Sequence, residues 1–115
     1  MNIVTQFQID GIHRWADCPF EEVDFLRSHH RHMFHIRCEK KVNHDDRDRE
    51  LIMFKKDIME YLEEEYYDVA HRTHFFDKMS CEQIARELYN RFDLSMCEVM
   101  EDGENGAIYR GVEGW

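Results

Sequence analysis

The sequence has few residues that would keep a chain from folding, with one proline and five glycines among 115 residues. Hydrophobic residues make up 43% of it and aromatic residues 13%, so the composition is that of a folded protein rather than a disordered one. A chain of this length fits a single domain, which we expect to span residues 1–115.

Other absences exclude classes of partner. No apolar run approaches the roughly eighteen residues that are needed to span a bilayer. The first residues lack the basic start and apolar core of a signal peptide. The net charge of −10 would repel nucleic acid and anionic membrane surfaces. We therefore expect a cytoplasmic protein without a nucleic-acid or membrane partner.

The sequence also lacks a C-x-x-C pair. Its four cysteines are scattered through the chain as Cys18, Cys38, Cys81 and Cys97. This pattern is typical of reduced thiols in a cytoplasmic protein rather than of a disulfide framework.

Hydrophobic alternation predicts two strands in the first third of the chain. Residues 3–13 alternate with period two and end at His13, which indicates a half-buried strand. Residues 14–29 read as a loop. From His30 the alternation returns, with His30, His32 and Phe34 on one face and His35 on the other.

The rest of the chain predicts two helices and a hairpin. Apolar residues recur at helical spacing over about 50–65, and Ser80 with Gln83 forms a capping box that starts a second helix. Strands at about 96–101 and 106–112 flank a turn that contains Asp-Gly and Asn-Gly. The order β-β-α-α-β-β predicts an α+β domain, a four-stranded antiparallel sheet with two helices on one face. Its open edges would be closed by a ring of subunits.

Three histidines are candidate metal ligands. His30 and His32 share a strand face, and an antiparallel neighbour could bring His13 beside them. Three imidazoles with an open fourth position are typical of catalytic zinc. The alternative is an incidental cluster, because an H-x-H pair alone is common.

Other residues are candidates for binding and proton transfer. Glu101 falls on the inward face of its strand, where a carboxylate needs a partner such as an N–H-rich heterocycle; the alternative is that it only rims the hairpin. Cys18, in the loop, could supply a thiolate. His71 and His74 form an H-x-x-H pair, with Asp68 three residues before His71.

Four motifs together resemble those of the 6-pyruvoyl-tetrahydropterin synthase family, which includes the 6-carboxy-tetrahydropterin synthases. "FQIDGIHRW" resembles the family's strand that ends in a histidine, and "HRHMF" its H-G-H-x-[YF] strand, with Arg31 where glycine is usual. "MSCEQIA" resembles the P-T-[SA]-E-x-[IL]-A helix start, and "CEVMEDGENGAIY" the strand ending in glutamate and the tyrosine strand after it. The resemblance covers about residues 3–110.

The resemblance implies a T-fold with zinc on His13, His30 and His32 and a pterin ring anchored by Glu101. Members of the family assemble as rings, commonly dimers of trimers, with the active site between subunits. They are carbon–oxygen lyases that expel triphosphate from 7,8-dihydroneopterin triphosphate. The implied partners are thus a pterin or nucleotide-like small molecule and further copies of the chain.

The sequence departs from the family where acid–base chemistry is concerned. The family's catalytic cysteine lies a few residues before the H-x-H motif, but residues 24–28 contain no thiol and Cys18 lies twelve residues before His30. Glu22 or Asp24 could replace it. The family's Asp-His pair also lacks a clean match, which leaves His71 or His74 as the proton shuttle. Three functions stay open: a zinc-dependent pterin lyase, a T-fold protein that binds a pterin or purine-like nucleotide without turning it over, and an assembly or interaction protein whose histidines are incidental.

Overall fold

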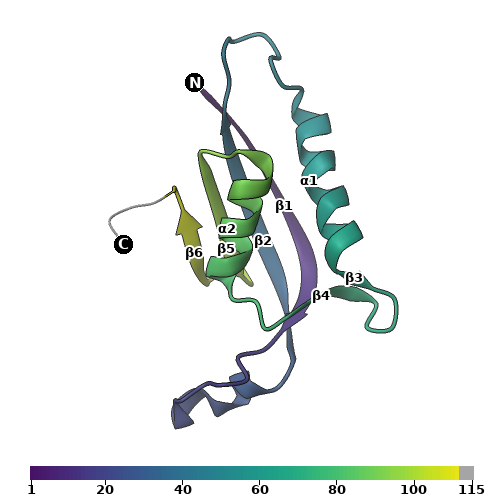
Figure 1. The fold of residues 1–115 in the computed structure, drawn as a ribbon, viewed down its shortest axis with the longest axis vertical. Coiled ribbons are helices and arrows are strands. Elements are labelled where there is room, and N and C mark those ends of the chain that lie inside the picture. Colours follow the sequence, from purple (N-terminus) through teal and green to yellow (C-terminus); the bar gives the residue numbers. More distant parts are fainter. Residues whose placement is uncertain (112–115) are drawn as a thin grey trace.

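A computed structural model describes residues 1–111 and arranges them around one six-stranded sheet with the order β3-β4-β1-β2-β5-β6. Along the chain the elements are β1 (Asn2–His13), η1 (Glu21–Arg27), β2 (His30–Lys41), α1 (Leu51–Tyr66), β3 (Tyr67–Asp68), β4 (Thr73–Asp77), α2 (Cys81–Phe92), β5 (Met96–Glu101) and β6 (Asn105–Tyr109). Figure 1 shows α1 and α2 side by side on one face of the sheet, and the segment between β1 and β2 extending beyond its end. Among the described residues no helix is long and apolar enough to cross a membrane.

The predicted α+β class is confirmed, but the four-stranded antiparallel sheet is wrong. Two further strands, β3 and β4, come between α1 and α2 in the chain. β4 pairs in parallel with β1, so the sheet is mixed. The two strands have two and five residues, which is too short for an alternating pattern to appear in the sequence. The predicted loop at 14–29 contains a 3-10 helix, η1, none of whose residues is buried. Residue 112, the predicted end of the last strand, lies outside the described residues.

Local sequence explains where the two long helices begin. Ser80 accepts a hydrogen bond from the Gln83 backbone N–H while the Gln83 side chain returns one to the Ser80 N–H, as the capping box predicted. α1 uses Glu50, whose carboxylate accepts from the backbone N–H groups of Ile52 and Met53. These contacts satisfy amides that have no partner within the helix.

One hydrophobic core joins both helices to the inward face of the sheet. Its members include Phe54, Ile58 and Leu62 of α1, Ile84, Ala85 and Leu88 of α2, and Phe7, Ile36 and Val99 of the sheet. Burial of this set is the main stabilising contribution, at roughly 1.5–3 kcal/mol for each large side chain.

The end of this core forms the floor beneath the three histidines. The Phe34 ring lies with its centre 5.3 Å from that of His13 and 5.3 Å from that of Phe76. Gly11 makes the packing possible, because a Cβ there would lie 2.7 Å from Phe76 and 2.9 Å from Phe34. A strand glycine at such a point of close approach leaves room for the rings.

Candidate metal centre

The antiparallel β1–β2 pair brings the three predicted histidines together. His13, the last residue of β1, lies opposite His30, the first residue of β2, and Gly11 lies opposite His32. The ring centres are separated by 4.7 Å for His13 and His30, 5.2 Å for His13 and His32, and 4.9 Å for His30 and His32. One nitrogen from each ring lies within 4.8 Å of the other two, so the group could hold a metal ion.

Each of the three rings has its Nδ1 atom next to an oxygen atom. Nδ1 of His13 lies 2.9 Å from the Met79 carbonyl, and Nδ1 of His30 lies 2.8 Å from the Ser28 carbonyl. Nδ1 of His32 lies 2.8 Å from a carboxylate oxygen of Asp102. Since these oxygens only accept, Nδ1 carries a proton in each ring, and Nε2 has a free lone pair whenever the ring is neutral. Metal-binding histidines in proteins are oriented in this way.

Two of the three Nε2 atoms are buried and make no hydrogen bond of good geometry, although Oε2 of Glu101 lies 2.8 Å from one and 3.6 Å from the other. They belong to His13 and His32, whose side chains are 8% and 18% exposed. A buried polar atom without a well-formed hydrogen bond destabilises a protein, and a metal ion at this point would satisfy both nitrogens. The donor set, three neutral imidazoles, suits zinc and other first-row transition metals. The residues present therefore fit a metal ion.

Glu101 adds a carboxylate to the same centre. It ends β5, and its Oε2 atom lies 2.8 Å from Nε2 of His13 and 3.6 Å from Nε2 of His32. Contact with the His13 imidazole lowers the pKa of Glu101, against the opposing effect of burial. Glu101 is therefore ionised at neutral pH.

The histidines respond differently to these surroundings. Burial alone lowers the pKa of His13, but the Glu101 carboxylate and the Met79 carbonyl more than compensate and leave it raised. For His30 burial prevails, and together with the two neighbouring imidazoles it lowers the pKa. His30 therefore stays neutral more readily than His13.

A cavity of about 580 Å³ opens beside the centre, on the side of His13 and His30, and Glu101 forms part of its wall. Trp15 and Leu26 line it from the segment between β1 and β2, which we call the flap (residues 14–29). The first turn of α2 forms another wall. Cavities of roughly 300–1,000 Å³ are typical of small-molecule sites.

The predicted thiol and carboxylate bases do not line this cavity. Cys18 is only 3% exposed, and its thiol donates within the flap to the carbonyls of Phe20 and Val23. Glu22 and Asp24 are exposed residues of η1. None of the three is among the residues of the cavity wall.

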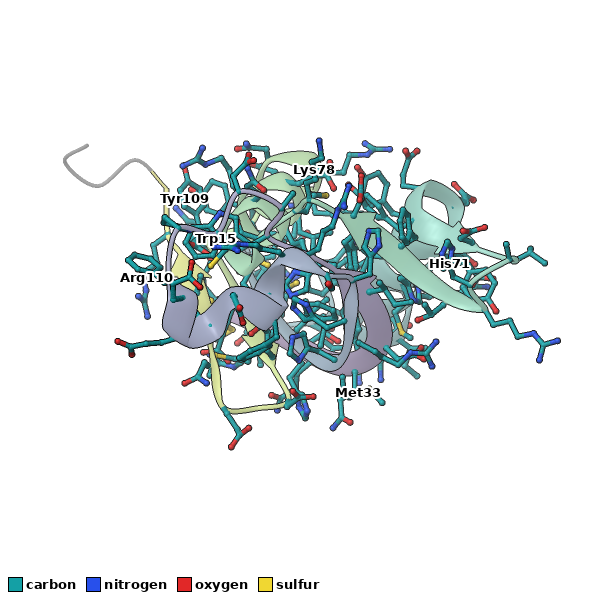
Figure 2. The ribbon with its side chains drawn as sticks, turned by 90° about the horizontal axis from the view of Figure 1, so that it is seen from below. Trp15, Met33, His71, Lys78, Tyr109 and Arg110 are labelled. Atoms are coloured by element: carbon teal, nitrogen blue, oxygen red, sulfur yellow. The ribbon has the colours of Figure 1, made fainter. Side chains whose placement is uncertain are left out.

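The predicted proton shuttles lie elsewhere as well. The His71 ring is hydrogen-bonded to the Asp68 carboxylate across the turn between β3 and β4, so a carboxylate–imidazole pair exists although the two residues are not adjacent in sequence. Nδ1 of His74 lies 2.9 Å from the Asp10 carbonyl. Neither histidine lines the cavity, and Figure 2 shows His71 on the opposite side of the molecule from Trp15.

Two residues of the centre were missed from the sequence. Asp102 looked like a turn residue only, yet its left-handed backbone (φ 56°) directs the carboxylate to His32 and to the backbone N–H of Met33, 3.0 Å away. Cys81 starts α2 and lines the cavity beside Glu101. Burial, followed by the Glu101 charge, raises the pKa of its thiol to about 12. Neither role has a signal in local sequence, because each depends on contact between distant elements.

Comparison of the chain with known protein families and with curated proteins finds no match in either.

Proposed function

We propose that the protein is a zinc-dependent pterin enzyme of the 6-pyruvoyl-tetrahydropterin synthase type, a carbon–oxygen lyase that eliminates triphosphate from 7,8-dihydroneopterin triphosphate or a close analogue. One observation carries the proposal. Three imidazoles have Nδ1 next to an oxygen and Nε2 directed to a common centre beside an ionised carboxylate, Glu101, and two of them line one cavity together with Glu101. The choice of a pterin as the substrate and of triphosphate elimination as the reaction comes from the motif resemblance.

His13, His30 and His32 would hold the metal. Zinc bound there would act as a Lewis acid that polarises an oxygen atom of the ligand's side chain. Three histidines leave a fourth position for such an oxygen, as is typical of catalytic zinc sites.

Glu101 is suited to anchoring the heterocycle rather than to removing protons. Its lowered pKa keeps it ionised and makes it a weak base at neutral pH. An ionised carboxylate accepts two parallel N–H bonds well, as the amino group and ring N–H of a pterin would require. The Cys81 thiol lines the same cavity and contributes to the lowered pKa of Glu101.

The acid–base group is proposed to come from a second copy of the chain. Within one copy, the described cavity wall contains none of the five residues proposed as base or shuttle, Cys18, Glu22, Asp24, His71 and His74. The Asp68–His71 pair has the form of an oriented general base and is about half-exposed. It lies near the sheet edge that β3 forms, where a neighbouring copy can approach. A ring such as a dimer of trimers, the arrangement that the resemblance implies, would bring the pair to a neighbour's cavity.

A second function is favoured by the same observation. If no second copy supplies the base, the centre binds a pterin or purine-like nucleotide without turning it over. The first turn of α2 and Glu101 would still provide the polar edge of such a site.

The experiment that separates the two functions is a turnover assay. Zinc-loaded protein is incubated with 7,8-dihydroneopterin triphosphate, and the released triphosphate is measured. The lyase proposal predicts release that is lost in His30→Ala and in His71→Ala but kept in His35→Ala, a matched histidine on the opposite face of β2. Tight binding without release above background in the unsubstituted protein would contradict the lyase and support the binding protein.

A further inference from the structure

Trp15 differs from the rest of the cavity wall in its chemistry. It follows His13 by two residues and is the second residue of the flap, where its backbone N–H donates to the Leu26 carbonyl at 2.7 Å. This bond joins the two ends of the flap, and both side chains line the cavity. A second bond, from Arg27 Nε to the Cys18 carbonyl at 2.9 Å, ties the flap internally. The indole is thus carried by an anchored segment.

A large part of the Trp15 surface is exposed. The residue is 45% exposed, and its ring meets Phe20 at a steep angle of 64°, with 5.9 Å between the ring centres. Figure 2, which looks onto the flap, labels Trp15 on this side of the molecule. Exposed apolar surface beside a cavity is typical of a ligand-binding site.

The carboxylates and the amide of the cavity wall bind by their edges rather than by a face. Glu101 is an ionised acceptor, and Glu82 and Gln83 bring a further carboxylate and an amide from the first turn of α2. Such groups fix hydrogen bonds in the plane of a ring but do not cover the ring itself. Among residues 1–111, which the structure describes, Trp15 alone lines the cavity with an aromatic six-membered ring.

We propose that Trp15 is the stacking platform of the site, so that a flat heterocycle is held at its edge by Glu101 and across its face by the indole. This inference rests on the proposed function, because it takes the ligand to be a pterin or purine-like ring. It assigns to Trp15 the selection of fused, planar ligands. Stacking on an aromatic side chain tolerates different ring systems, so selection among them is left to Glu101.

The test uses the emission of Trp15 itself. The chain has two tryptophans, so Trp115→Phe leaves Trp15 as the only indole. Zinc-loaded Trp115→Phe protein is titrated with neopterin, a pterin without phosphate, and binding is followed in parallel by calorimetry. The proposal predicts saturable quenching of Trp15 emission with the same midpoint as the calorimetric isotherm.

Two substitutions at position 15 separate stacking from apolar contact. Trp15→Leu, which keeps an apolar side chain without a π face, is expected to raise the Kd for neopterin roughly tenfold, whereas Trp15→Phe keeps most of the affinity. Phe25→Leu is the matched control, because Phe25 belongs to the same flap, is 64% exposed and does not line the cavity. Zinc content and thermal midpoint verify that each variant is folded.

The outcomes distinguish this inference from the function on which it rests. One outcome is that neopterin binds and Glu101→Gln abolishes the binding, while Trp15 emission does not change and Trp15→Leu binds with unchanged affinity. This outcome would overturn the stacking role and leave the proposed function standing. Absence of any calorimetric binding to the zinc-loaded protein would overturn both.

Discussion

Asp102 offers a sharp test of the metal centre because it can be changed without touching a ligand. In Asp102→Asn the left-handed backbone conformation (φ 56°) is retained, since asparagine tolerates it well. The side-chain amide can still accept from the Met33 N–H, but the charge that faces Nδ1 of His32 is lost. The change therefore acts on how His32 is oriented and on its basicity as a ligand.

The size of the effect follows from the contact and its exposure. Loss of a partner that orients a metal-ligating histidine typically costs about 10–100-fold in metal affinity. The Asp102 side chain is 47% exposed, so water replaces part of its effect. We expect the lower end, about tenfold weaker zinc binding, or about 1.4 kcal/mol.

The assay is competition for zinc with a chromogenic chelator at constant pH. Asp93→Asn is the matched control, because Asp93 also has a left-handed backbone (φ 52°) but caps the end of α2. It should leave the zinc affinity unchanged. Equal zinc affinity in Asp102→Asn and the unsubstituted protein would refute the role of Asp102, as would an equal loss in both variants.

Three further predictions concern stability. In metal-free protein the raised pKa of His13 gives a stabilising contribution that is complete below the unfolded pKa of 6.5 and disappears as pH rises through the folded pKa. The lowered pKa of Glu101 gives a contribution that is complete above the unfolded pKa of 4.5 and disappears as pH falls through the folded pKa. Thermal scans in the presence of chelator should therefore show a stability maximum that includes pH 4.5–6.5, and this maximum should be flatter in Glu101→Gln. An unchanged pH profile in that variant would rule out the His13–Glu101 pair as the source of the maximum. Gly11→Ala should lower the free energy of unfolding in urea by roughly 1–3 kcal/mol through overpacking, and no change would contradict the close approach of the two rings. Ser80→Ala removes the cap of α2 and should cost about 0.5–2 kcal/mol, measured in the same way, with a smaller cost for Ser80→Asn.

Much of this centre could be predicted from the sequence because it depends on strand geometry. Period-two alternation placed His30 and His32 on one face, and the end of the first strand placed His13 within reach of an antiparallel neighbour. Glu101 followed from the same alternation on the strand after α2. These predictions need only the local backbone and one strand pairing.

The parts that could not be predicted depend on contacts between distant segments. β3 and β4 are too short to show a period, and the parallel pairing of β4 with β1 is fixed only by tertiary packing. The oxygens that face the Nδ1 atoms come from Met79, Ser28 and Asp102, and two of the three are backbone carbonyls, which no side-chain pattern marks. The flap looked like a plain loop because η1 has only seven residues, too few for a helical period to show in the sequence.

The central claim is that His13, His30 and His32 form one metal centre, and zinc stoichiometry tests it most directly. Elemental analysis of purified, zinc-reloaded protein should give one zinc per chain, and the variants His13→Ala, His30→Ala and His32→Ala should each lose most of it. His35→Ala, which removes a histidine from the opposite face of β2, should keep the full equivalent. A zinc content below about a tenth of an equivalent after reloading, or a full equivalent in the three variants, would contradict the account.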